Sequence, residues 1–212
     1  MLERILNIIF PPVCGICGKI DKNFLCKKCQ KKLEKQSYFK VDTYEINFKE
    51  HMFIFKYDGD IRDLILKYKF KEQSYLYKTF ANFMLKNEIF FDFIKKYDII
   101  IPIPISQKRY NQRGYNQSLL IAKELAKKTN LKLENEIIFK QKNIIEQSKL
   151  DKKQREENIK NVYKIRKTTK IEGKNILIFD DIFTTGNTVI ECAQTLETLN
   201  PQKIGVLTIA KD

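Results

Sequence analysis

The C-terminal third of the chain alternates apolar runs with one amphipathic segment. The run at 175–179 reads NILIF, the segment at 187–199 reads NTVIECAQTLETL, and the run at 203–210 reads KIGVLTIA. Short apolar runs are typical of buried strands, and apolar residues at helical spacing between them predict a crossover helix. Strands joined in this way lie parallel, and a parallel sheet needs helices on both faces.

The same alternation continues toward the N-terminus. Each apolar run there is followed by a turn or by an amphipathic segment. We therefore predict an α/β fold with a doubly wound, mostly parallel sheet, whose ligands sit at the carboxyl ends of strands. The further strands are expected at 51–56, 98–105, 135–140 and 161–165, and the further helices at 60–70, 74–87 and 116–130.

Four of the five cysteines fall in the stretch CGICGKIDKNFLCKKC, as two C-x-x-C pairs formed by Cys14, Cys17, Cys26 and Cys29. Two such pairs can place four thiolates around one tetrahedral Zn²⁺, which leaves no open position for catalysis. A redox pair or disulfides are the alternatives, but nothing else in the sequence indicates an oxidising compartment. Cys192 stands alone in a helical stretch and is expected to be a small buried residue.

Two domains follow from this organisation. Residues 1–36 are expected to form an N-terminal helix and a four-cysteine zinc-binding module, and residues 37–212 the α/β domain. The charged, weakly patterned segment 30–50 is interpreted as a bridge between them.

The composition favours a polyanionic partner. Lys and Arg number 40 against 26 Asp and Glu, a formal net charge of +14, which suits a nucleic acid, a phosphorylated small molecule or an anionic membrane surface. A simple bias toward Lys, Ile and Asn codons would give the same excess. The single histidine, His51, argues against His-dependent triads and His-rich metal sites, and is expected on the surface or in a strand.

No apolar run approaches the roughly 20 residues that span a bilayer. The first 14 residues lack the features of a secretory signal, so a cytoplasmic location is predicted. Apolar residues at helical spacing, Leu2, Ile5, Leu6 and Ile9, are expected to pack on the domain; the alternative is peripheral contact with the inner face of the cytoplasmic membrane.

The strand at 175–179 leads into Asp180 and Asp181, and the small, polar residues Thr184, Thr185, Gly186, Asn187 and Thr188 then open the following helix. Backbone N–H groups and hydroxyls at a helix N-terminus bind phosphate. The preceding carboxylates can accept hydrogen bonds from ribose hydroxyls and help to hold Mg²⁺. An ordinary N-cap turn needs only one such residue, so we interpret this loop as a ligand site.

The strand at 98–105 is followed by an expected loop that contains Lys108, Arg109 and Arg113 together with Tyr110 and Tyr115. Cations can neutralise a pyrophosphate, and Tyr beside Arg suits the stacking of single-stranded bases. The alternative is an ordinary solvated turn. The segment at 146–161, EQSKLDKKQREENIKN, is polar and is expected to be a mobile loop or a solvated helix.

These motifs resemble those of a known family. The aspartate pair and its loop resemble the phosphoribosyl-pyrophosphate loop of the type I phosphoribosyltransferase fold. The order of CGICGK…CKKC, FKYDGDIRDLILKYKFK, IPIPISQKRYNQRGYNQSLLIAKELA, REENIKNVYKI and ILIFDDIFTTGNTV is similar to that of the ComF family of competence proteins. Glu72 departs from the family, which often has Gly there, and NVY replaces a more usual Gly-Ala-Phe-like end.

The resemblance implies a phosphoribosyltransferase-type fold with structural Zn²⁺, and binding of phosphoribosyl pyrophosphate with Mg²⁺. It implies that Lys108, Arg109, Arg113 and Arg155 meet pyrophosphate or DNA, and that 146–161 closes over the site with Gln147, Arg155 and Asn158 matching the family pattern.

Two functions are compatible with this resemblance. The first is a competence protein that handles incoming single-stranded DNA, with other DNA-uptake proteins as further partners. The second is an active phosphoribosyltransferase, in which Asp180 and Asp181 would be catalytic, acting on an unidentified nucleobase-like acceptor. A third function, a regulator that binds duplex DNA, is not supported, because the sequence shows no helix-turn-helix pattern.

Overall fold

The computed structural model describes residues 11–141, 162–166 and 171–212. Its centre is a six-stranded sheet with the strand order β1-β2-β8-β7-β3-β4. The β1–β2 pair is antiparallel, whereas β2–β8, β8–β7, β7–β3 and β3–β4 are parallel pairs. These strands are β1 (Ser37–Thr43), β2 (Glu50–Lys56), β3 (Ile99–Pro102), β4 (Lys132–Leu133), β7 (Asn175–Phe183) and β8 (Lys203–Lys211). The mostly parallel sheet that the alternation predicts is confirmed.

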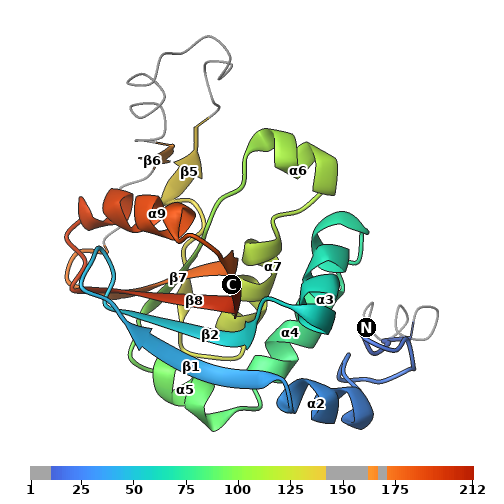
Figure 1. Ribbon diagram of the computed structural model, residues 1–212. Helices are drawn as coiled ribbons and strands as arrows, with labels where there is room; N and C mark the ends of the chain where they lie inside the picture. The colour runs from blue at the N-terminus through green and yellow to red at the C-terminus, as the bar shows by residue number, and fades with distance from the viewer. Residues whose placement is uncertain (1–10, 142–161, 167–170) are drawn as a thin grey trace.

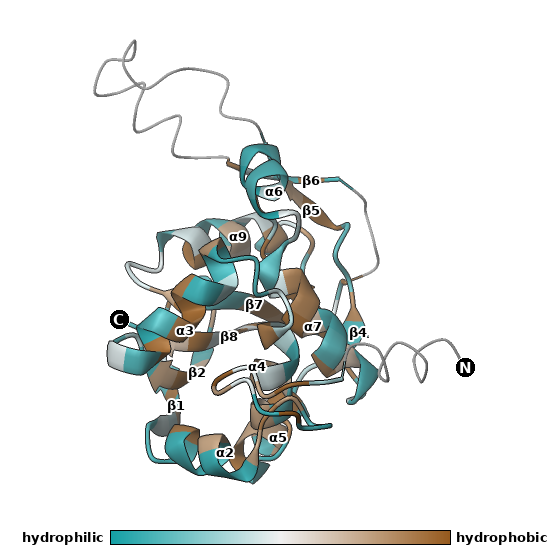
Figure 2. Cartoon of the chain, turned by 90° about the vertical axis from the view of Figure 1, so that its right-hand side faces the viewer, coloured by the Kyte–Doolittle hydropathy of each residue, from teal (hydrophilic) through white to brown (hydrophobic). Residues whose placement is uncertain are grey.

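Apolar residues alternate between the two faces of each central strand, and helices cover both faces. In β7, Leu177 and Phe179 face one apolar cluster, while Ile176 and Ile178 face the other. The first cluster packs under α3 (Gly59–Phe70), α4 (Leu76–Met84), α5 (Glu88–Ile94) and α7 (Gln117–Lys127). The second packs under α9 (Asn187–Glu197) and a hairpin of β5 (Ile138–Lys140) and β6 (Tyr163–Ile165) (Figure 1). Figure 2 shows the apolar residues gathered in the strands and the polar ones on the outer helix faces.

Several local features differ from the sequence-based expectations. The runs at 135–140 and 161–165 do form strands, but they pair antiparallel with each other, outside the main sheet. The segment 30–50 was expected to be a bridge between the two domains, but helix α2 (Lys27–Glu34) and strand β1 occupy much of it. Strand β7 runs on to Phe183, so Asp180 and Asp181 belong to the strand and not to the loop after it.

The basic segment after β3 is a helix, not the loop expected from its sequence. Helix α6 (Gln107–Arg113) begins where the Ser106 hydroxyl accepts a hydrogen bond from the Arg109 amide at 3.3 Å. It ends at Gly114, whose φ of 77° is the left-handed conformation that glycine adopts readily. None of its residues is buried, so no apolar periodicity marks it in the sequence.

The described part of the zinc-binding module packs against α4. Thr79 Oγ1 donates a hydrogen bond to the Phe24 carbonyl at 2.8 Å, and Asn82 Nδ2 donates to the Asn23 carbonyl at 2.7 Å. A Cβ on Gly15 would lie 2.3 Å from Thr79 Oγ1, so only glycine allows this approach. The domain boundary at residue 36 stays a prediction, and the apolar positions 2–9 lie outside the described residues.

Cys192 is fully buried, as expected. His51 lies in β2 but is also fully buried, with Nε2 2.8 Å from Thr208 Oγ1, so it is not a surface residue. Within 11–141, 162–166 and 171–212, the structure contains no helix long and apolar enough to span a membrane.

Candidate functional site

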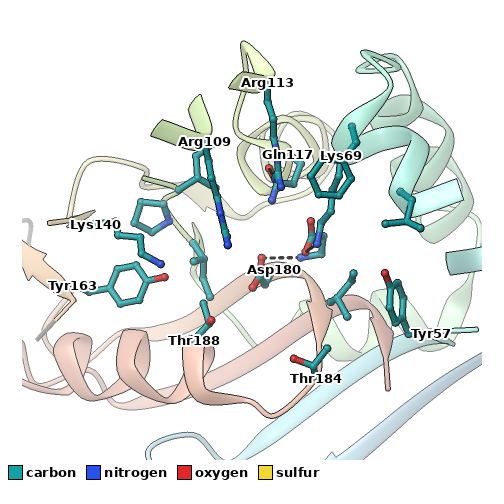
Figure 3. A pocket seen from close by; sticks show the side chains of 17 residues that line it. Tyr57, Lys69, Arg109, Arg113, Gln117, Lys140, Tyr163, Asp180, Thr184 and Thr188 are labelled. Carbon is teal, nitrogen blue, oxygen red and sulfur yellow. Dashed lines mark hydrogen bonds and ion pairs between the residues drawn. The ribbon is translucent and has the colours of Figure 1, made fainter. Parts of the chain in front are cut away.

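A pocket of about 360 Å³ lies at the carboxyl ends of β3 and β7, where ligands of such sheets bind. Side chains reach it from α3, α6 and α7, from both hairpin strands and from the start of α9 (Figure 3). Its charged and hydroxyl-bearing residues are Lys69, Arg109, Arg113, Lys140, Tyr57, Tyr163, Asp180, Asp181, Thr184 and Thr188. Residues from both segments singled out in the sequence, the basic one after β3 and the one that follows β7, therefore line one pocket.

The two aspartates hold their carboxylates in different ways. Asp180 Oδ1 accepts hydrogen bonds from Ser118 Oγ at 3.0 Å and from the Asp181 amide at 2.9 Å. Asp181, only 3% exposed, places Oδ1 2.9 Å from Lys69 Nζ. Its buried Oδ2 finds no hydrogen-bond partner among the described residues. An unsatisfied buried acceptor is costly, so this atom is suited to a ligand hydroxyl.

Burial, together with the charge of Asp181, raises the pKa of the Asp180 carboxyl to about 7, while Lys69 acts in the opposite direction. Two carboxylates this close repel unless a cation or a hydrogen-bond donor is shared between them. Lys69 is the partner that the adjacent aspartates require. Sequence reasoning missed it, although it lies within the quoted motif FKYDGDIRDLILKYKFK.

The predicted phosphate loop forms the turn between β7 and α9. Gly186 is the N-cap of α9 with a φ of 78°, and no side chain makes a cap hydrogen bond there. The first amide groups of a helix lack intrahelical acceptors and carry its positive end. Thr184 and Thr188 line the pocket, while Thr185 and Gly186 belong to the turn and Asn187 is the first residue of α9. A Cβ on Gly186 would lie 2.6 Å from the Phe183 ring.

Only some of the predicted basic residues lie at the pocket. Arg109 and Arg113 line the pocket, whereas Lys108 lies exposed on the same helix and does not line it. Arg113 Nη1 donates to Gln117 Oε1 at 2.9 Å. Arg155, with Gln147 and Asn158, lies outside the described residues.

The two tyrosines proposed for base stacking differ. Tyr110 is 47% exposed and remains available. Tyr115 is only partly exposed: its ring stacks on Tyr68 with centroids 5.8 Å apart, and its hydroxyl donates a hydrogen bond to the Tyr68 carbonyl. These contacts hold Tyr115 against the domain.

Two further pocket residues come from the β5–β6 hairpin. Lys140 Nζ lies 5.3 Å from the centroid of the Tyr163 ring. Burial, followed by the charge of Arg109, lowers the pKa of Lys140. The Tyr163 hydroxyl is buried and has no hydrogen-bond partner in the described part of the chain. Sequence reasoning predicted their strands but gave neither side chain a role.

The four predicted cysteines form one cluster, with all Sγ atoms within 4.8 Å of one another. A tetrahedron with Zn–S bonds of about 2.3 Å has S···S edges of about 3.8 Å, and Cys17 Sγ lies 3.7 Å from Cys26 Sγ. Burial raises the pKa of Cys14, but hydrogen bonds with the backbone of Cys26, Cys17 and Ile16 outweigh it and leave the pKa at about 7. The donor set fits a structural Zn²⁺ with four protein ligands.

Comparisons with known proteins agree with this structure. The phosphoribosyl transferase domain model matches residues 116–212, and the double zinc ribbon domain model matches residues 5–38. Competence protein F of Haemophilus influenzae is 26% identical over 91% of this chain and 92% of that protein. The chain is thus similar to competence proteins of the ComF family over most of its length. Its fold is accordingly of the phosphoribosyltransferase type, with an N-terminal four-cysteine zinc ribbon.

Two other relatives show the same kind of similarity. Competence protein ComFC of Bacillus subtilis is 28% identical over 87% of this chain and 71% of that protein. DNA utilization protein YhgH of Escherichia coli O6:H1 is 33% identical over 47% of this chain and 43% of that protein.

Proposed function

We propose that this ComF-like protein acts in natural transformation, handling incoming single-stranded DNA in the cytoplasm through a surface that includes a ribose-phosphate pocket. Its relatives are named competence protein F, competence protein ComFC and DNA utilization protein YhgH, and these names support the competence role. The side chains that line the pocket support a ribose-phosphate ligand.

The observation that carries the ligand proposal is the buried Oδ2 of Asp181, which lies beside a helix N-terminus and has no hydrogen-bond partner in the part of the chain that the structure describes. The carboxylate is an acceptor for sugar hydroxyls, and the amide groups that begin α9, with Thr184 and Thr188, are donors for a phosphate. Arg109 and Lys140 add positive charge for a second anionic group. Phosphoribosyl pyrophosphate carries all three features.

Mg²⁺ would accompany such a ligand. Carboxylates are oxygen donors of the kind that Mg²⁺ prefers, and it usually binds through one or two of them together with phosphate oxygens. Because Asp181 Oδ1 already contacts Lys69, we assign the main protein contribution to Asp180. The ion would supply charge neutralisation for the diphosphate.

Binding of single-stranded DNA is supported by the net charge of +14 and by the exposed Tyr110, which lies between arginines on α6. Lysine and arginine attract the phosphate backbone, and an exposed aromatic ring stacks bases. Such binding weakens steeply as salt concentration rises.

The test compares wild type with Asp180→Asn/Asp181→Asn, both loaded with zinc. Mg²⁺-phosphoribosyl pyrophosphate is expected to raise the melting temperature of wild type but not that of the double variant. Binding of a fluorescent single-stranded oligonucleotide is then measured at several salt concentrations. Absence of thermal stabilisation in wild type contradicts the ligand proposal, and absent or salt-independent oligonucleotide binding contradicts the DNA proposal.

Transferase activity is a second candidate. The phosphoribosyl transferase domain match and the two carboxylates at the ribose position favour it, because they would stabilise developing positive charge on the sugar. Release of pyrophosphate with a nucleobase, abolished in Asp181→Asn, supports turnover. No release with any common nucleobase supports binding alone.

A further inference from the structure

Lys140 is a half-buried lysine of β5 that lines the pocket without a partner of opposite charge. Its ammonium group lies against the Tyr163 ring and forms no ion pair or hydrogen bond within residues 11–141, 162–166 and 171–212. By contrast, Lys69 in the same pocket is paired with Asp181 at 2.9 Å. The nitrogen of Lys140 is therefore available to a ligand.

The surroundings of Lys140 favour its neutral form. Burial, followed by the charge of Arg109, lowers the pKa of Lys140, although the carboxyl groups of Glu191 and Asp180 act in the opposite direction. A lysine that is desolvated, or that lies next to a second cation, is activated as a nucleophile, because the neutral amine keeps its lone pair. Lys140 thus has the environment of a reactive amine as well as that of an anion-binding cation.

The position of Lys140 relative to a sugar follows from the ribose-phosphate proposal. Phosphoribosyl pyrophosphate carries its diphosphate on C1 of the ribose, and Lys140 with Arg109 would lie at that group. Ribose 5-phosphate has no diphosphate on C1, and in its open-chain form C1 is an aldehyde. The amine then faces the aldehyde carbon itself. Figure 3 shows the polar ends of Lys140 and Tyr163 next to each other, directed into the pocket.

We propose that Lys140 forms a reversible imine with an aldehyde-bearing pentose 5-phosphate. This deepens the proposed function and rests on its ribose-phosphate site. The nitrogen lone pair attacks C1 to form the C–N bond, and the C=O electron pair moves to the oxygen, which takes up a proton. Loss of one water gives the imine, and addition of water reverses the step, so no oxidant or reductant is needed. The abasic 5′ end of a DNA strand presents the same chemistry, an aldehyde on a pentose 5-phosphate.

Two neighbouring groups suit the proton transfers of this step. The Tyr163 hydroxyl is buried and has no hydrogen-bond partner in the described part of the chain. Burial raises its pKa, so it stays a neutral donor for the aldehyde oxygen. The Asp180 carboxyl has a pKa of about 7, so near neutral pH it can give a proton to the departing hydroxyl and accept one from the nitrogen.

The experiment incubates the zinc-loaded full chain with ribose 5-phosphate and sodium cyanoborohydride, which reduces an imine to a stable secondary amine. Peptide mass spectrometry then locates the modified lysines. Lys140 is expected to be modified before the exposed lysines, and Lys140→Arg, which keeps the charge but lacks the nucleophile, should lose this early adduct. Lys164→Arg is the matched control and should retain it, because Lys164 is exposed on the paired strand β6 and does not line the pocket.

Two further arms identify the site and the source of the aldehyde. Mg²⁺-phosphoribosyl pyrophosphate has no free aldehyde and should protect Lys140 by occupying the pocket. A single-stranded oligonucleotide with an abasic 5′ deoxyribose phosphate replaces ribose 5-phosphate in the second arm. Cross-linking of Lys140 to this oligonucleotide supports the proposal with DNA as the source, and modification by ribose 5-phosphate alone supports it with the free sugar as the source.

The outcomes separate the two proposals. If ribose 5-phosphate raises the melting temperature but neither aldehyde probe modifies Lys140 faster than the exposed lysines, the imine is overturned and the ribose-phosphate site stands. If ribose 5-phosphate neither stabilises the protein nor modifies Lys140 preferentially, the ribose-phosphate site falls and takes the imine with it. Preferential modification without protection by phosphoribosyl pyrophosphate supports the imine and contradicts the diphosphate ligand.

Discussion

Lys69 Nζ lies 2.9 Å from Asp181 Oδ1 and joins the C-terminal turn of α3 to the central strand β7. Both side chains are largely removed from solvent, with 16% and 4% exposed. One oxygen of Asp181 is paired with Lys69, and the other has no hydrogen-bond partner among residues 11–141, 162–166 and 171–212. The pocket therefore offers a free acceptor to a hydroxyl-bearing ligand.

Removal of Lys69 should leave a buried carboxylate without its cation. We expect Lys69→Met to lower the free energy of unfolding by about 3 kcal/mol, measured by urea denaturation at neutral pH. The control is Lys32→Met, which breaks the Lys32–Asp60 pair of similar length, 2.7 Å, with side chains 55% and 58% exposed. Solvent screens that exposed pair, so its loss should have a much smaller effect. Equal losses in the two variants would show that Asp181 does not depend on Lys69.

The titration of Asp180 should make stability depend on pH. The unfolded chain ionises this carboxyl near its ordinary pKa of 3.8, whereas the folded protein does so at about 7, chiefly because of burial. The folded state therefore binds more protons in between. The contribution of Asp180 is complete below the unfolded pKa and is lost as pH rises through about 7.

Asp180→Asn should accordingly gain stability relative to wild type as pH rises from about 4 to about 7, with little further change above that, in urea denaturation. Asp42 provides a contrast, because its hydrogen bond with Lys211 lowers its pKa. Asp42→Asn should therefore be less stable than wild type throughout this range, without a comparable gain as pH rises. A constant difference between Asp180→Asn and wild type would contradict the raised pKa.

Gly186→Ala tests the phosphate loop. A left-handed conformation costs a non-glycine residue about 1 kcal/mol, and the new Cβ would also meet the Phe183 ring. That ring cannot move aside easily, since it packs 4.5 Å from the buried His51 ring, centroid to centroid. We expect a loss of about 2 to 4 kcal/mol and loss of thermal stabilisation by the phosphate ligand.

Gly114→Ala is the matched control, with a nearly identical φ of 77° but nothing within 4 Å of its Cβ. It should be destabilised by about 1 kcal/mol, and ligand-induced stabilisation should persist. If both variants retain ligand binding to the same extent, the loop at Gly186 is not the phosphate site.

Removal of zinc should destabilise the zinc-binding module and also its contacts with α4. Without metal the cysteine cluster loses its cross-link, and the contacts of Phe24 and Asn23 with α4 lose their support. Cys17→Ser is expected to reduce the bound zinc measured by atomic spectroscopy and to lower the melting temperature. Cys192→Ala should keep one zinc per chain, because Cys192 lies in the other apolar cluster. An unchanged melting temperature after chelation would contradict a structural role for the metal.

Glu72→Gly should stabilise the protein. Glu72 has a φ of 55° in the turn after α3, where glycine carries no steric penalty, and we expect a gain of about 1 kcal/mol. The neighbouring Lys71 has a φ of −120°, so Lys71→Gly should instead lose about 0.5 kcal/mol. Urea midpoints measure both, and a loss of stability in Glu72→Gly would contradict the conformational argument.

Sequence patterns predicted the parts of the fold that depend on local periodicity. Strands β7 and β8 with helix α9 were found because apolar runs and a helical spacing are visible within a few residues. Helix α6 was missed because it buries nothing. The predicted cysteine cluster also formed, since the two C-x-x-C pairs already bring their thiolates close along the chain.

The site was only partly predictable, for a physical reason. Asp180, Asp181 and the α9 turn are contiguous, so their chemistry can be inferred from one stretch. Lys69 and Lys140 acquire their roles only when α3 and β5 are folded against β7, and no local pattern encodes that arrangement. The partial burial of Tyr115 was not predicted for the same reason, because its contact with Tyr68 joins the α6–α7 connection to α3, which is distant in sequence.

The position of the aspartates within a strand has a mechanical consequence. Strand β7 lies between β8 and β3, with Asp180 in register with Thr208, so the acidic groups sit on the stiffest part of the molecule. Arg109 and Lys140 are carried on α6 and on the β5–β6 hairpin, which lie outside that sheet. Any adjustment to ligands of different size should therefore be one-sided, with the cations moving toward a stationary pair of carboxylates.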